Sequence, residues 1–443
     1  MHNMGLENHI SLGNLLVSLL VEVGRIQEAQ QLFDKLFYRN ECSWNSLISG
    51  YAKHGEPHRA LLLYHEMKKD DSLKPSMYTY VALLKACANL KDSKRGCEIH
   101  SEIASKSLLE TNVFIGSSLL HMYAQCGFIE KAQEVFHKLP VRDRVAWNTL
   151  ITGFIENERG VEACQAFEQM QLEGVSPDSI TFVGILKAYS KIGAMEKAQE
   201  IHAQIDKSGK IESIAVATAL VDMYVQNGLL TKAQHVFEEL STRDLVSWNT
   251  LISGYTLQGK GHEALICFER LKSEGLSPDV VTFTCILKAC GINRAMGKGK
   301  QIHEDILNKR LLERDIVLGN ALVDMYIKCQ SIEEARYVFD KLENRDVVSW
   351  NTLISHYAEF GPWIEALNHF ESMQKEKILP DFITFCCIIK ACTNLRDLQK
   401  GQILHMEIMM KGFEQKVNVG NSLTNMYVNC GCFLEAWRVV YGL

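Results

Sequence analysis

The chain has 443 residues, of which 47% are hydrophobic and 23% are charged, and it contains only 7 prolines. This composition is typical of a folded, mostly helical protein and excludes an intrinsically disordered one. The formal net charge is −6 and the sequence has no run of basic residues. Gross charge therefore cannot drive binding to nucleic acid, and any electropositive surface must be a local groove.

The 14 cysteines mostly recur at equivalent places in the sequence, with Cys87, Cys290 and Cys392 at one position and Cys126, Cys329 and Cys430 at another. Small thiols at equivalent helical sites indicate core residues in a reducing compartment. Without a CxxC pair, a structural zinc site has no ligands, and we expect no metal or other cofactor. Apolar stretches all fall short of the roughly 18 residues that a membrane span needs, so we expect no membrane contact.

The strongest signal along the chain is a Trp-Asn pair that recurs at spacings of 103, 101 and 102 residues. Its copies are Trp44-Asn45, Trp147-Asn148, Trp248-Asn249 and Trp350-Asn351. Two more blocks keep the same period, one reading YVALLKACANL at residues 80–90 and one reading SSLLHMYAQCG at residues 117–127. Such a period predicts a repeat architecture, in which each super-repeat holds three related units of 31 to 36 residues.

Each unit is predicted to be a helical hairpin. Trp248, Leu251, Ile252 and Tyr255 follow the i, i+3, i+4, i+7 pattern of one helical face, and a second apolar stripe covers residues 264–271. Glycines lie between the two segments, where a turn is needed. Two short helices cannot bury these stripes alone, so we expect the hairpins to stack into an all-α solenoid with one elongated core.

The sequence matches place the unit boundaries in chain order. Residues 1–9 are interpreted as the end of a truncated repeat, and the chain is expected to stop partway through another. A single unit at 10–40 comes first, followed by three triplets at 41–143, 144–244 and 245–346. Two single units at 347–381 and 382–416 follow, and the partial unit covers 417–443.

The three-part rotation, reading SWNTLISGY, TF..ILKAC and GNALVDMY, resembles the P, L and S motifs of plant pentatricopeptide repeat proteins of the PLS subclass. The resemblance covers essentially the whole chain. It implies a right-handed superhelical solenoid of hairpins like those of tetratricopeptide repeats. It also implies single-stranded RNA as the partner, read at one base per repeat, in mitochondria or chloroplasts. No transit segment is visible in the sequence.

The resemblance further implies that the fifth and the last residue of each repeat read one base together. The P and S units give eight such pairs: Asn14 with Asn40, Asn45 with Ser76, Ser117 with Asp143, Asn148 with Asp178, Thr218 with Asp244, Asn249 with Asp279, Asn320 with Asp346, and Asn351 with Asp381. By the family's code, Asn with Asp implies U, Ser or Thr with Asp implies G, and the other two pairs imply C or a pyrimidine. The implied RNA is 5′-C-Y-N-G-U-N-G-U-N-U-U-N-3′.

L units fit this code poorly, because their fifth residues are Val81, Val183, Thr284 and Cys386. Most of these side chains make no good hydrogen bond to a base edge, so we expect L units to read weakly. The resemblance also implies an apolar second residue wedged between bases, a position held by Val145, Val246, Val348, Phe114 and Val317 and, less convincingly, by Ala215 and Asn418.

Purely structural roles compete with these assignments. An Asp after Pro or Arg is a common N-cap for the next helix, and an Asn can bond to a neighbouring unit. The repeated Trp is expected to pack in the core. The recurrent histidines of the L units are also expected to be partly buried packing residues: His100, His202, His303 and His405.

Catalysis by this chain is not expected. His100-Ser101-Glu102 matches half of a cytidine deaminase signature, but the Pro-Cys-x-x-Cys half is absent. The resemblance favours a specificity factor for organellar RNA processing, above all C-to-U editing, with a deaminase supplied by a separate protein or by a missing C-terminal domain. The alternative is a protein-binding helical scaffold, which the acidic balance would suit.

Overall fold

The computed structural model describes residues 10–70, 72–106, 108, 112–209, 212–313 and 315–441. The segment 1–9, interpreted as the end of a truncated repeat, lies outside them. Within these residues every regular element is an α-helix, and the chain divides into two compact units, Met1–Asn227 and Gly228–Leu443. Each unit is described by itself.

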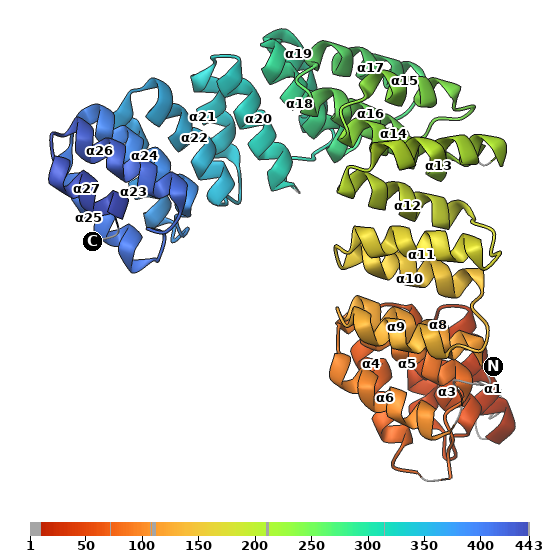
Figure 1. The fold of residues 1–443 in the computed structure, drawn as a ribbon. Helices are drawn as coiled ribbons and strands as arrows, with labels where there is room; N and C mark the ends of the chain where they lie inside the picture. The colour runs from red at the N-terminus through yellow and green to blue at the C-terminus, as the bar shows by residue number, and fades with distance from the viewer. Residues whose placement is uncertain are drawn as a thin grey trace. The chain divides into compact units, whose positions relative to one another are not determined.

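In the first unit, helices alternate between two layers (Figure 1). One layer holds the first helices of the hairpins: α1 (Ile10–Glu22), α3 (Glu41–Lys53), α5 (Met77–Leu90), α8 (Val113–Gln125), α10 (Arg144–Glu156), α12 (Ser179–Ile192) and α14 (Ile214–Gln226). The other layer holds the second helices: α2 (Ile26–Lys35), α4 (Pro57–Met67), α6 (Ser93–Ser105), α9 (Ile129–Lys138), α11 (Gly160–Leu172) and α13 (Met195–Lys207).

The second unit repeats this arrangement. Its first helices are α16 (Leu245–Leu257), α18 (Val280–Asn293), α20 (Ile316–Lys328), α22 (Val347–Phe360), α24 (Phe382–Leu395) and α26 (Val417–Asn429). Its second helices are α15 (Leu230–Glu239), α17 (Gly261–Ser273), α19 (Met296–Asn308), α21 (Ile332–Lys341), α23 (Trp363–Lys375), α25 (Leu398–Met410) and α27 (Phe433–Tyr441). The segment 417–443, expected to be a partial repeat, thus contains both helices of a hairpin.

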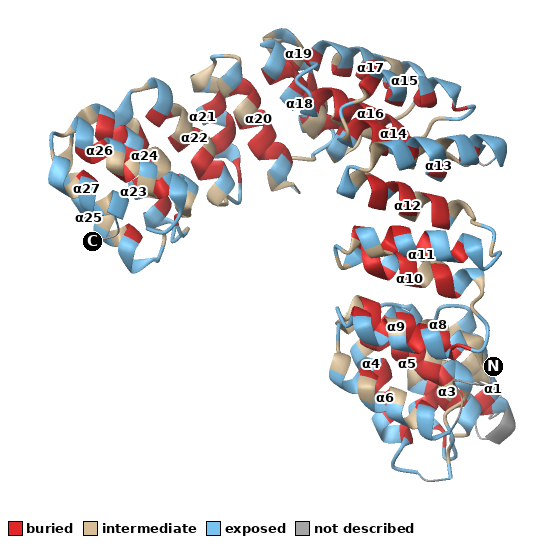
Figure 2. Ribbon diagram, viewed as in Figure 1, coloured by how far each residue is buried: buried red, intermediate tan, exposed pale blue. Residues whose placement is uncertain are grey.

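Stacking follows from the apolar stripes. Within each unit a first helix packs on its own partner and on the first helix of the next hairpin, as α10 does with α11 and α12. The buried residues of Figure 2 accordingly lie on the faces where helices meet. The all-α solenoid of hairpins predicted from the sequence is therefore confirmed.

The repeated Trp packs in this core, as predicted. Trp44, Trp147, Trp248 and Trp350 are between 0% and 7% exposed. Each ring stands edge-on against a phenylalanine of the preceding second helix, with ring centroids 4.6 Å apart for the pair of Phe237 and Trp248. An edge-to-face pair adds to the energy of apolar burial, so this Trp joins consecutive hairpins and is not available to stack on a base.

The recurrent histidine of the L units is also a packing residue, as predicted. His100 Nδ1 lies 2.8 Å from the hydroxyl of Tyr123, and His303 Nδ1 lies 2.8 Å from that of Tyr326. The same contact joins His202 to Tyr224 and His405 to Tyr427. The bond links the second helix of one hairpin to the first helix of the next.

Candidate nucleic-acid interface

Four of the predicted reading pairs meet at the start of a first helix. Asp279 is the N-cap of α18, where its Oδ1 accepts hydrogen bonds from the Thr282 amide and the Thr282 hydroxyl, both at 2.8 Å. Asn249, one hairpin earlier on α16, donates its Nδ2 to the same oxygen at 3.1 Å. The Asp279 carboxylate therefore caps α18 and also bonds to Asn249, so the two predicted contacts do not exclude each other.

Thr282 completes this cluster. Its hydroxyl lies 2.7 Å from Asn249 Oδ1 as well as 2.8 Å from Asp279 Oδ1. A hydroxyl carries one proton, so it serves these two acceptors alternately. The effect is to hold the Asn249 amide in one orientation, with its nitrogen toward the carboxylate.

Two other P units reproduce the cluster closely. Asn148 Nδ2 donates to Asp178 Oδ1 at 3.0 Å, and Asn351 Nδ2 donates to Asp381 Oδ1 at 3.0 Å. A threonine hydroxyl again reaches the asparagine oxygen in each case. In the first P unit Ser76 caps α5 instead, and the Thr79 hydroxyl donates to Asn45 Oδ1.

The S unit at Asn320 differs in one bond. Asn320 Nδ2 donates to Asp346 Oδ1 at 3.2 Å, but the hydroxyl of Ser349, the third residue of the next repeat, bonds to Asp346 and not to Asn320. Among the described residues, the buried Asn320 Oδ1 has no hydrogen-bond partner. Leaving such a group unsatisfied costs about 1–3 kcal/mol, so this unit lacks one of the bonds that orient the asparagine in the P units.

The remaining S units are less alike. Asn14 is only 1% exposed, and its side chain bonds to the backbone, donating to the Tyr38 carbonyl at 3.2 Å and accepting from the Asn40 amide at 3.1 Å. Ser117 is half-buried on α8, and Asp143 caps α10 through the Ala146 amide. Thr218 belongs to the first unit, whereas Asp244 belongs to the second, where it caps α16.

Four of the carboxylates predicted to read bases have a lowered pKa and are therefore ionised at neutral pH. Burial by itself would raise the pKa of Asp279, but the hydrogen bonds from Thr282 and Asn249 outweigh it and lower the pKa below its ordinary value. The pKa values of Asp178, Asp346 and Asp381 are lowered by the same balance. An ionised carboxylate only accepts hydrogen bonds, so any group that pairs with it must offer a donor such as an N–H.

Exposed apolar side chains border these pairs. The predicted wedges Phe114, Val145, Val246, Val317 and Val348 are between 52% and 76% exposed. The sequence analysis missed the equivalent second residues of the L units, although the repeat register would have located them: Tyr78, Ile180, Val281 and Ile383. An exposed aromatic or aliphatic side chain provides a face on which a base can stack.

A groove in the first unit brings these groups together. It has a volume of about 620 Å³ and is lined by residues of α1, α3 and α5. Asn45 and Ser76, a predicted reading pair, share its lining with Tyr78, Lys53 and Lys85. Polar side chains, an aromatic ring, two lysines and the carboxylate of Glu22 thus line one recess.

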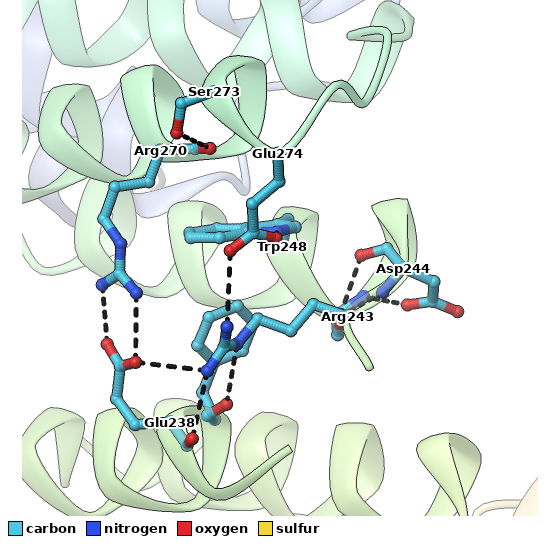
Figure 3. Close-up of polar contacts among 9 residues, drawn as sticks. Glu238, Arg243, Asp244, Trp248, Arg270, Ser273 and Glu274 are labelled. Carbon is cyan, nitrogen blue, oxygen red and sulfur yellow. Dashed lines mark hydrogen bonds and ion pairs between the residues drawn. The ribbon is translucent and has the colours of Figure 1, made fainter. Parts of the chain in front are cut away.

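An ion network fixes the backbone beside Asp244 (Figure 3). Arg243 donates to the carbonyl oxygens of Phe237 and Glu238, at 3.3 and 3.0 Å, and pairs with Glu274 at 3.3 Å. Glu274 also accepts the indole N–H of Trp248 at 3.0 Å. The arginine preceding the cap therefore ties α15, α16 and α17 together and holds the reading carboxylate in place.

The described residues contain no cluster of three or more His, Cys, Asp or Glu side chains arranged to hold a metal ion. In that same part of the chain, no helix combines the length and apolarity required to cross a membrane.

Comparison with known proteins agrees with the geometry. A family model described as the PPR repeat family matches residues 39–89, 142–191, 243–291 and 345–394, and the PPR repeat model matches 117–143, 216–245 and 320–347. A mitochondrial pentatricopeptide repeat-containing protein of Arabidopsis thaliana is 31% identical over 97% of this chain and 41% of its own length. A putative member from the same plant is 32% identical over 98% of this chain and 71% of its own.

The chain spans about half the length of the first curated relatives it matches, such as a chloroplastic Arabidopsis thaliana protein of which it covers 49%. Among solved structures, the crystal structure of the maize pentatricopeptide repeat protein PPR10 aligns with a TM-score of 0.62 at 18% identity, covering 97% of this chain and 73% of that one. PPR10 in complex with an 18-nt psaJ RNA element aligns with a TM-score of 0.52 at 17% identity, over 98% and 73%. From its repeats, its fold and its relatives, the chain belongs to the pentatricopeptide repeat family.

Proposed function

We propose that this protein binds single-stranded RNA with base selectivity, through the eight P and S pairs, and that it directs C-to-U editing of an organellar transcript as a PLS-type specificity factor. The observation that carries the proposal is the side-chain bond between fifth and last residues, repeated at Asn148, Asn249, Asn320 and Asn351. Four equivalent amides each meet a carboxylate at the same place in the hairpin.

The chemistry of these pairs suits a pyrimidine edge. In the Asn249 cluster all the bonds to the carboxylate converge on Asp279 Oδ1, so Oδ2 can accept an N–H from a base. The second amide proton of Asn249 can donate to a carbonyl oxygen of the same base. Uracil offers that combination of a ring N–H and carbonyl oxygens, which supports the expected U at Asn-Asp units.

Two comparisons support the wider setting. PPR10, a protein of similar fold, has been crystallised in complex with an 18-nt psaJ RNA element. Relatives of this chain are named mitochondrial or chloroplastic. Editing itself rests on the resemblance of the P, L and S rotation of the repeats to the PLS subclass. In this proposal the deaminase is a separate protein or another part of a longer chain.

The experiment is a titration of the purified chain against the implied 12-nucleotide RNA and a base-shuffled RNA of the same composition. If each pair discriminates by about 1 kcal/mol, one mismatch weakens binding about fivefold. Equal or negligible binding of both RNAs at low salt overturns the proposal. A protein-binding scaffold is then the remaining function. For editing, crosslinking of the native protein in organelles should place its footprints beside edited cytidines, and footprints unrelated to edited sites would contradict that role.

A further inference from the structure

The L units lack good base-reading side chains at their fifth residues, yet they share a cation. Four residues after the fifth position, each L unit carries an exposed lysine on its first helix: Lys85 on α5, Lys187 on α12, Lys288 on α18 and Lys390 on α24. Residues four apart are neighbours on one face of a helix. Each lysine therefore lies one turn further along the helix on the same face as the fifth residue.

This cation is specific to L units. At the equivalent position the P units carry Ser49, Thr152, Ser253 and Ser355, and the S units of the described hairpins carry Ser18, His121, Asp222, Asp324 and Asn425. Every third hairpin thus places a positive charge beside the reading row. In the groove of the first unit, Lys85 lines the same recess as Asn45 and Ser76.

Three of the four lysines are available for a ligand. Lys390 pairs with Glu359 at 2.9 Å. Among the described side chains, Lys85, Lys187 and Lys288 form no ion pair. Asp324, which holds the equivalent position in the S unit after Lys288, is already paired with Lys328 at 2.7 Å. An exposed ammonium with no carboxylate partner is free to meet an incoming anion.

We propose that L units anchor the RNA backbone, with Lys85, Lys187 and Lys288 contacting phosphates while the P and S units read bases. This inference rests on the proposed RNA binding. Because the chain has a formal charge of −6 and each reading carboxylate adds a negative charge to the row, attraction to RNA has to come from local cations. A lysine binds phosphate as a compact point charge without selecting a base. Lys390 contributes less, since Glu359 neutralises it.

The test measures the salt dependence of binding. For single-stranded nucleic acid, the slope of log K against log salt changes by about 0.7 for each phosphate contact. The triple variant Lys85→Gln, Lys187→Gln, Lys288→Gln should flatten the slope by about 2 and keep the fold preference for the matched RNA over a single-mismatch RNA. The corresponding triple Lys→Arg variant should keep the native slope.

A matched control removes the same charge from second helices, at the exposed Lys94, Lys207 and Lys375 of α6, α13 and α23. That triple Gln variant should leave the slope unchanged, and Lys390→Gln should flatten it less than Lys288→Gln does. An unchanged slope in the L-unit triple, or equal flattening by both triples, overturns the inference even when the native protein selects its RNA. Failure of the native protein to bind RNA refutes the proposed function instead.

Discussion

Replacing Asp279 by alanine tests the double role of the reading carboxylate. The substitution removes the N-cap of α18, which contributes about 1 kcal/mol, and it leaves the Asn249 amide without its acceptor, which costs about 1 kcal/mol more. A total of about 2 kcal/mol corresponds to a roughly 30-fold larger equilibrium constant for opening of the capped turn. Hydrogen exchange at the Phe283 amide measures this opening, because that amide donates to the Asp279 backbone carbonyl, which the variant keeps.

Two further variants separate capping from base reading. Asp279→Asn should preserve slow exchange, because Asn caps helices about as well as Asp, while loosening the preference for U at one nucleotide. Asp397 caps α25, a second helix, through the Lys400 amide at 3.0 Å. Asp397→Ala should therefore accelerate exchange in α25 without altering RNA preference. Unchanged exchange in Asp279→Ala, or a change in base preference in Asp397→Ala, would refute the reasoning.

Two predictions concern the joints between hairpins. Burial lowers the pKa of His303 and His405 in the folded chain, because it disfavours the charged imidazolium. The two neutral rings therefore contribute their full stability to the folded chain above the unfolded pKa of about 6.5. This contribution is lost as pH falls through the folded pKa. Melting temperature should drop between pH 7.5 and 5.5, and the drop should shrink in the double His→Gln variant; an equal drop in both proteins would contradict this. Trp248 Nε1 donates to Glu274, whereas the buried Trp147 Nε1 has no hydrogen-bond partner among the described residues. Trp248→Phe should therefore destabilise more than Trp147→Phe, by about 1–2 kcal/mol in denaturant unfolding, and equal losses would count against it.

The sequence was sufficient to predict the hairpins and the inward Trp, because both depend on periodicity along the chain. The apolar second residues of the P and S units came from the family resemblance, and those of the L units were not predicted. The sequence also suggested that Asn249 and Asp279 belong together. It did not reveal that the Thr282 hydroxyl links them, since that contact depends on how neighbouring hairpins pack.

Differences among equivalent residues were harder to anticipate. Asn14 and Asn320 occupy the same repeat position, yet the first is closed off by backbone bonds and the second keeps an unsatisfied oxygen. The third residue of the next hairpin is a serine in both cases, Ser43 and Ser349, so the difference depends on packing that a repeat alignment averages away. The boundary between the two compact units, after Asn227, could not be predicted from the repeat pattern either.

Base selectivity at a single unit is tested most directly by Asn249→Thr. Competition binding compares two RNAs that differ only in U or G at the nucleotide assigned to the pair of Asn249 and Asp279. The native protein should favour U, and the variant should favour G, each by about fivefold for roughly 1 kcal/mol of discrimination. A folded variant with the same preference as the native protein would contradict reading by this row of side chains.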